Sequence, residues 1–161
     1  MTGTVDRAGI TASGRATART AAPAPDGTQH LSHSATATAS SVEGGLPRLA
    51  ARMANDGDPG TRWASSHSDN QWLQLELAAP STVESVELDW EQACAKSFAI
   101  DVSVDGTTWT RAATVDQGTC GTDLVRLPDT GPVRFVRMQG LTRATPYGYS
   151  LHELRVFGNP V

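Results

Sequence analysis

The segment from Ala54 to Trp63 reads Ala-Asn-Asp-Gly-Asp-Pro-Gly-Thr-Arg-Trp. Its carboxylates, glycines and proline are typical of a tight turn and are unfavourable in a helix or strand. A turn rich in carboxylate, carbonyl and hydroxyl oxygens suits a hard cation such as Ca²⁺, although an ordinary surface turn explains the segment equally well. The helix–loop–helix calcium motif does not match, because no glutamate stands at the position which that motif requires. A complete cation site would need a distant carboxylate, and Glu153 is the candidate.

On both sides of this turn, alternating apolar and polar residues predict short β-strands. Segment 71–77 has a leucine at every second position, as in a strand with one buried face. Segment 98–104 runs into Asp105-Gly106, which is a strong hairpin signal. The side chains expected to face the core of these strands and of segment 83–90 are Leu73, Leu75, Leu77, Val86, Leu88, Trp90, Phe98, Ile100, Val102 and Val104.

About eight such strands, separated by turn residues, predict an all-β chain. A loop with one helical turn is expected over 43–52, and no long helix is needed elsewhere. The spacing favours a β-sandwich of jelly-roll type with antiparallel strands. The predicted strands cover residues 34–40, 71–77, 83–90, 98–104, 109–115, 123–127, 133–138 and 151–157.

Length and composition indicate one folded domain and disfavour some classes of partner. The chain has 161 residues, enough for one domain with its own core. Residues 1–28 are rich in Ala, Thr, Gly and Pro, so we expect a disordered N-terminal extension, a flexible linker or tag remnant, before a folded domain at 29–161. The formal charge of −4 gives no electrostatic reason to expect nucleic acid or an anionic membrane, and no apolar run is long enough to cross a bilayer.

Several segments together resemble a known family. Residues 54–65 and 71–77, followed by Leu88-Asp89-Trp90-Glu91 and Tyr147-Gly148-Tyr149-Ser150-Leu151-His152-Glu153-Leu154, are similar to the discoidin (coagulation factor 5/8 type C) domains. Segments 102–109 and 134–137 match as well. Within the family the likeness is greatest to the bacterial carbohydrate-binding modules of family 32. It covers about residues 29–159.

The resemblance implies a structural Ca²⁺ where the turn meets the last strand, with sodium as an alternative. Such an ion would tie an early loop to the terminal strand and add its binding energy to folding. Carried over position by position, the ligands are the carbonyls of Met53 and His152 together with Asp56, Asp58, Thr61 and Glu153.

A sugar site needs an aromatic surface and a few fixed polar groups. Tyr147 and Tyr149 bracket a glycine in a loop, and Glu91 follows a strand end. The resemblance places Trp-Glu and Tyr-Gly-Tyr in one region, although core packing of Trp90 and loop packing of the tyrosines are alternatives. The candidate ligand-binding residues are Trp90, Glu91, Tyr147, Tyr149, Arg143 and Glu43. Because Ala64-Ser65 replaces an acidic position of amino-sugar binders, a neutral glucan and an amino-glucan both stay open.

Two cysteines, Cys94 and Cys120, can form one disulfide or remain two buried thiols. The resemblance is to secreted proteins and favours the disulfide, which would stabilise the fold by about 3–4 kcal/mol in the chain-entropy model.

The resemblance also implies a function. We expect a non-catalytic module that anchors a secreted, extracellular bacterial glycoside hydrolase, its parent enzyme in cis, to a polysaccharide, and we expect a monomer. An adhesion module that binds a cell-surface glycoprotein or a lipid headgroup is the alternative. The four histidines have no triad spacing. Glu43, Asp89 and Glu91 could be proposed as a glycosidase pair, but so small a domain has little room to enclose a substrate.

Overall fold

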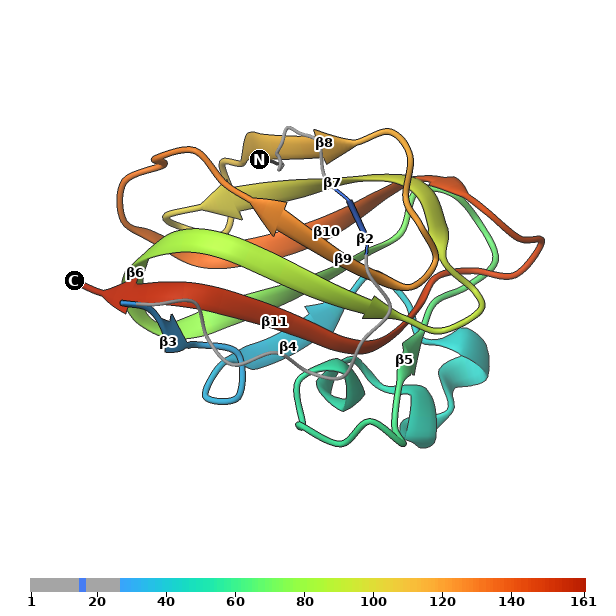
Figure 1. The fold of residues 1–161 in the computed structure, drawn as a ribbon. Coiled ribbons are helices and arrows are strands. Elements are labelled where there is room, and N and C mark those ends of the chain that lie inside the picture. The colour runs from blue at the N-terminus through green and yellow to red at the C-terminus, as the bar shows by residue number, and fades with distance from the viewer. Residues whose placement is uncertain (1–14, 17–26) are drawn as a thin grey trace.

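The computed structural model describes residues 15–16 and 27–161. Strands dominate, and three short 3₁₀ helices interrupt them between β4 and β5 (Figure 1). The elements are β2 (Arg15–Ala16), β3 (Gln29–His30), β4 (Thr36–Ala39), η1 (Glu43–Gly45), η2 (Pro47–Leu49), η3 (Ala51–Ala54), β5 (Trp63–Ala64), β6 (Trp72–Trp90), β7 (Ala95–Ser103), β8 (Thr110–Val115), β9 (Thr122–Arg126), β10 (Val133–Arg143) and β11 (Ser150–Pro160).

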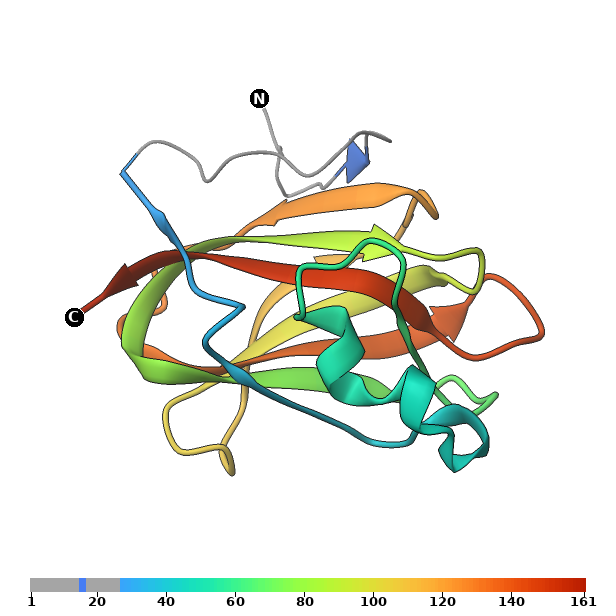
Figure 2. The same cartoon turned by 90° about the horizontal axis from the view of Figure 1, so that it is seen from below.

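The strand β6 connects the two layers of the fold. Its first half pairs with β4 and β10, and its second half pairs with β11 and β9, all antiparallel. Figure 2 shows the bend that carries β6 from one layer to the other. The bend contains Pro80, which has no N–H for a sheet ladder. The predicted strands 71–77 and 83–90 are therefore two halves of one strand, and the all-β sandwich is confirmed.

Each layer continues outward from β6. The first layer has the order β4, β6, β10, β7 and β8, and the second has β11, β6, β9 and β2, with β3 and β5 also paired to β11. The apolar faces meet between them, as the alternation predicts. The largest fully buried side chains of this core are Trp63, Tyr149, Phe98, Phe157, Leu73, Leu75, Leu77, Leu88, Ile100, Met138, Leu151 and Leu154.

The prediction that Val104 faces the core is wrong. Val104 is 71% exposed, because β7 ends at Ser103 and the chain turns outward there. The Asp105 carboxylate accepts hydrogen bonds from the N–H groups of Thr107 and Thr108, both at 2.9 Å. These bonds build the predicted hairpin turn and carry Val104 out of the strand pattern.

The disulfide between Cys94 and Cys120 is present, with the Cα atoms 5.3 Å apart. It joins the loop after β6 to the loop before β9. The prediction of a linker over residues 1–28 falls almost wholly outside the described residues. Among the residues that are described, no helix has the length and apolar character needed to cross a membrane.

Candidate functional site

The turn that follows η3 gathers oxygen atoms around the hydroxyl of Thr61. Its Oγ1 lies 2.6 Å from Asp56 Oδ2, 3.0 Å from the Asp58 carbonyl oxygen and 3.3 Å from the Met53 carbonyl oxygen. Gly57 adopts a φ of +76°, a conformation that glycine accepts without strain. Four of the predicted cation ligands are therefore side by side.

Glu153, on β11, completes this cluster from the far end of the chain. Its side chain is buried, and its Oε2 accepts a hydrogen bond from the Gly57 N–H at 3.0 Å. Its Oε1 is buried without a hydrogen-bond partner, and His33 Nε2 lies 3.7 Å away. Burial, followed by the interaction with Asp56, raises the pKa of Glu153 to about 8. An unpaired buried carboxylate oxygen among other oxygens is where a cation would be favoured.

The pKa of the neighbouring Asp56 is shifted in the opposite direction. Burial works against its ionisation, but hydrogen bonds from the Thr61 hydroxyl and the Asp58 N–H outweigh it and lower the pKa of Asp56. His152 directs its Nδ1 to the Thr61 carbonyl oxygen at 3.1 Å, which fixes the residue next to Glu153.

This donor set fits an oxygen-seeking cation. Across residues 15–16 and 27–161, no three or more His, Cys, Asp or Glu side chains are grouped to hold a metal. An ion between the turn and β11 would therefore depend on carbonyl and hydroxyl oxygens as much as on carboxylates. Ca²⁺ accepts such mixed oxygen ligands, whereas zinc prefers nitrogen and sulfur.

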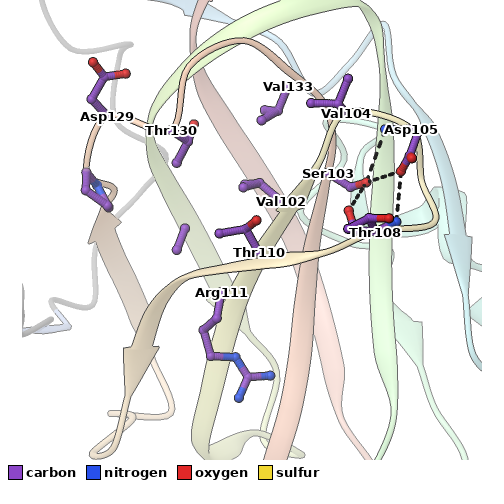
Figure 3. A pocket seen from close by; sticks show the side chains of 12 residues that line it. Val102, Ser103, Val104, Asp105, Thr108, Thr110, Arg111, Asp129, Thr130 and Val133 are labelled. Atoms are coloured by element: carbon purple, nitrogen blue, oxygen red, sulfur yellow. Dashed lines mark hydrogen bonds between the residues drawn. The ribbon is translucent and has the colours of Figure 1, made fainter.

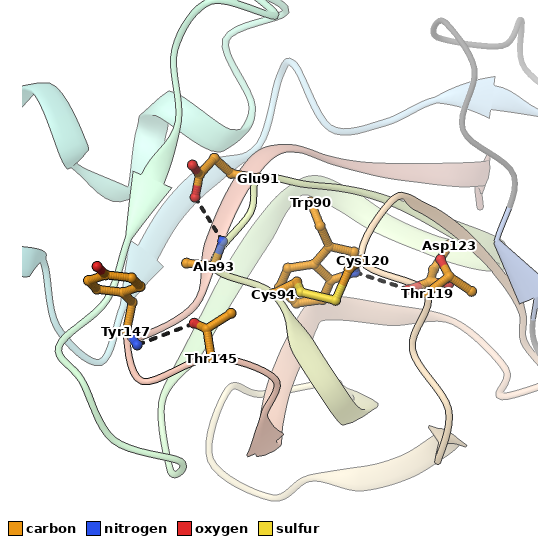
Figure 4. Close-up of a disulfide and its surroundings, with 9 residues drawn as sticks. All are labelled: Trp90, Glu91, Ala93, Cys94, Thr119, Cys120, Asp123, Thr145 and Tyr147. Carbon is orange, nitrogen blue, oxygen red and sulfur yellow. Dashed lines mark hydrogen bonds between the residues drawn. A yellow bond between two sulfur atoms is a disulfide. The ribbon is translucent and has the colours of Figure 1, made fainter.

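A hollow of about 370 Å³ lies at the end of the sandwich near the β10–β11 loop. Tyr147 stands at its edge with 61% of its surface exposed. Figure 4 shows Glu91 and Tyr147 on the same side of the disulfide, with Glu91 hydrogen-bonded to Ala93 and Tyr147 hydrogen-bonded to Thr145. Three predicted residues from three loops, Glu43, Glu91 and Tyr147, are thus brought together. The lining residues are Glu43, Arg62, Glu91, Gln92, Ala93, Thr145 and Tyr147.

Both carboxylates of this pocket are held by neighbours. Glu91 Oε1 accepts a hydrogen bond from the Ala93 N–H at 2.9 Å and lies 3.9 Å from Arg62 Nη1. Arg62 also donates to the Ser150 hydroxyl at 2.9 Å, so it bridges the pocket and β11. Glu43 Oε2 lies 3.3 Å from His67 Nε2. Both carboxylates keep part of their surface exposed.

Two residues that were predicted to contact a ligand, Trp90 and Tyr149, lie in the core. Trp90 is 5% exposed, and its Nε1–H donates to Asp123 Oδ2 at 3.1 Å. Tyr149 is fully buried, and its hydroxyl donates to the Asp69 carbonyl oxygen at 2.7 Å. Burial raises the pKa of Tyr149 well above its ordinary value. Neither ring can offer its face to a ligand, so the expectation of ligand contacts is corrected to core packing for both.

Arg143 does not line the pocket but hydrogen-bonds to the loop that carries Tyr147. Its Nε donates to Asp69 Oδ1 at 2.8 Å, and its Nη1 donates to the Pro146 carbonyl oxygen at 3.1 Å. The hydrogen bonds from Arg143 lower the pKa of Asp69. Arg143 therefore positions the loop that carries Tyr147 rather than lining the pocket.

The sequence alone did not indicate Arg62, Gln92 or Thr145 as pocket residues, or His67 beside the pocket. Arg62 donates to the Ser150 hydroxyl on β11 and also lines the hollow. His67 gave no motif signal, because its partners Glu43 and Tyr147 are distant in the sequence. Only the fold brings these residues together.

A second hollow, of about 440 Å³, lies between the β7–β8 hairpin and the loop after β9 (Figure 3). None of its lining residues is aromatic. Val133, at the start of β10, lines this hollow, whereas Thr145, just past the end of β10, lines the first. The two hollows therefore lie at opposite ends of the sandwich, and of these two the pocket with Tyr147 is the one that combines an aromatic ring with carboxylates.

The fold is a two-layered antiparallel β-sandwich whose end loops form a polar pocket with an exposed aromatic ring at its edge. Residues 36–154 match the model of the F5/8 type C domain, and the chain belongs to this family. The resemblance to discoidin domains is thereby confirmed. A search of curated proteins finds no significant match.

Solved structures give closer comparisons. Chitosan-binding module 1 of a chitosanase/glucanase from Paenibacillus sp. IK-5 is 42% identical, with a TM-score of 0.74 over 80% of this chain and 98% of that chain. Chitosan-binding module 2 of the same enzyme, in complex with chitotriose, is 34% identical, with a TM-score of 0.74 over 78% and 98%. A family 32 module from Clostridium perfringens, in complex with galactose, is 18% identical over 81% and 98%, with a TM-score of 0.69, and shows the shared fold.

Proposed function

We propose that this chain is a carbohydrate-binding module that binds a glucosamine-containing polysaccharide and acts without catalysis. The observation that carries the proposal is the convergence of Glu43 and Glu91 with the exposed ring of Tyr147 on one pocket. The identity with two chitosan-binding modules supports an amino-glucan over a neutral glucan.

Each part of the pocket would have a separate role. The C–H face of a pyranose packs on an aromatic ring, which Tyr147 supplies. A protonated amino group donates charge-assisted hydrogen bonds to a carboxylate, which Glu43 or Glu91 supplies. Arg62, held by Ser150, offers donors to sugar hydroxyls. Because the pocket is open and exchanges water contacts for sugar contacts, affinity at a single site is expected to be modest.

A modest affinity suffices for an anchoring role. We propose that the module is secreted with a polysaccharide-degrading enzyme and raises the local concentration of polymer at the catalytic domain. The Cys94–Cys120 disulfide agrees with an oxidising, extracellular environment. The turn at Asp56 together with Glu153 would hold a structural Ca²⁺, and the ion would supply positive charge to the buried Glu153 carboxylate and to the exposed Asp56.

Isothermal titration calorimetry with a glucosamine trimer tests the proposal. Glu91→Gln and Tyr147→Ala should each weaken binding by about three- to tenfold, because exposed ion pairs and stacking contacts contribute about 1 kcal/mol each. Glu84→Gln is the matched control. It removes the same charge from an exposed position on β6, about 20 Å from Glu91 along the strand. Tighter binding to anionic liposomes than to the trimer would overturn the proposal.

A further inference from the structure

His67 lies beside the pocket at a fixed place. The loop between β5 and β6 is held on both sides of it: the Ser66 N–H donates to the Ser41 hydroxyl at 2.9 Å, and the Ser68 N–H donates to the Ser66 carbonyl at 3.0 Å. The imidazole meets Tyr147 edge to face, with ring centroids 5.7 Å apart at 85°. It therefore touches the aromatic ring of the pocket as well as the Glu43 carboxylate.

The distance from His67 Nε2 to Glu43 Oε2 is 3.3 Å, short enough for a direct hydrogen bond or ion pair. A protonated imidazole would neutralise Glu43 and would place a positive charge beside a cationic ligand. A neutral imidazole would leave the carboxylate its charge. Histidine is the side chain that ordinarily changes its charge between about pH 5 and 8. The ability of Glu43 to bind an ammonium group then depends on whether His67 is protonated.

The charges around His67 leave Glu43 as its direct partner. Tyr147 contributes a neutral phenol from the β10–β11 loop. Asp69, two residues along the same loop, is bound to Arg143 at 2.8 Å. Across the pocket, Glu91 and Arg62 lie 3.9 Å apart and offset one another. The net charge that a ligand meets at this side of the pocket is therefore set by His67 and Glu43 together.

We propose that His67 sets the pH range in which the pocket accepts a cationic sugar, by competing with the sugar's ammonium group for Glu43 when it is protonated. This inference rests on the proposed function. Protonation of His67 then removes part of the affinity that acidification would otherwise add by charging the sugar amine. A neutral sugar, which needs no ionised carboxylate, escapes this competition.

Titration calorimetry of the full chain with a glucosamine trimer at pH 5.0 and pH 7.5 tests the role of His67. His67→Gln keeps a hydrogen-bonding side chain without a titrating proton, and position 67 is exposed, so folding should be unaffected. The variant should bind about tenfold more tightly than the wild type at pH 5.0 and within about twofold of it at pH 7.5, as expected for one nearby charge. The sugar and the other carboxylates titrate alike in both proteins and cancel in the comparison.

Two further measurements separate the possible causes. In a Glu43→Gln background, adding His67→Gln should change affinity at pH 5.0 by less than about twofold, because the shared partner is gone. Parallel pH profiles for wild type and His67→Gln would overturn the role of His67 alone. Absence of trimer binding by both proteins at either pH would overturn the proposed function and this inference with it.

Discussion

Glu153 is the side chain whose charge bears most directly on stability. Its pKa in the folded protein is raised from 4.5 to about 8, chiefly by burial, whereas the unfolded chain ionises it near the ordinary value. Between these values the folded state binds more protons at Glu153, so the contribution of Glu153 to the free energy of unfolding falls as pH rises from about 4.5 to about 8. His30 acts in the opposite direction up to about pH 6.5, because burial lowers its pKa to about 4 in the folded protein. In chelator, urea unfolding of the wild type should show this fall between pH 5 and pH 8. Glu153→Gln stays neutral, so its free energy of unfolding should fall less over this pH range. Equal falls in both proteins would contradict the role of Glu153.

Gly140 lies directly against the buried ring of Tyr149, which leaves no room for a side chain at position 140. A Cβ at this position would lie 2.3 Å from the Tyr149 ring, which is itself fully buried and cannot move aside. Gly140→Ala should therefore lower the free energy of unfolding by about 1–3 kcal/mol, as overpacking does. Thr142→Ala, at an exposed position of the same strand, should change it by less than about 0.5 kcal/mol. Chemical denaturation measures both, and equal effects would show that Tyr149 is not tightly packed.

Among the elements, β6 and the loops at its end determine where the pocket lies. Trp90 closes the strand inside the core, and Glu91 follows at the surface, because the alternation of the strand ends there. In the same loop, Cys94 is bonded to Cys120, which holds the β6–β7 loop against the β8–β9 loop (Figure 4). The disulfide is thus part of the support for Glu91 as well as of the fold.

Removal of this disulfide should affect both stability and binding. Cys94→Ala with Cys120→Ala opens a loop with a sequence separation of 26, and the chain-entropy model gives a loss of about 3–4 kcal/mol in the free energy of unfolding. Affinity for the glucosamine trimer should fall by less than about threefold, because Ala93 still binds Glu91 through its backbone. Adding reductant to the double variant is the control and should change neither quantity. Unchanged stability would contradict the prediction.

For the molecule as a whole, a cation between the turn and β11 would join an early segment to the last strand. An ion that binds only the folded state raises stability by about 2.7 kcal/mol at a hundredfold excess over its Kd. Calcium should therefore raise the melting temperature by several degrees and leave trimer affinity within about twofold, because the two sites use different side chains. Calorimetric melts in calcium and in EDTA check this, and Glu153→Gln should lose the calcium effect. A melt of the wild type that EDTA leaves unchanged would contradict the calcium proposal.

The sequence predicts most of the strand segments, the hairpin at Asp105 and the cluster of oxygen groups at Asp56, because these depend on alternation and turn chemistry within a few residues. It also placed Glu43, Glu91 and Tyr147 among the candidates. The folded chain alone reveals that Trp90 and Tyr149 are buried, that Arg143 hydrogen-bonds to the β10–β11 loop and that His67 pairs with Glu43. Contacts of this kind join residues from separate loops, so no local pattern specifies them. The packing of the two layers of the sandwich brings these residues together.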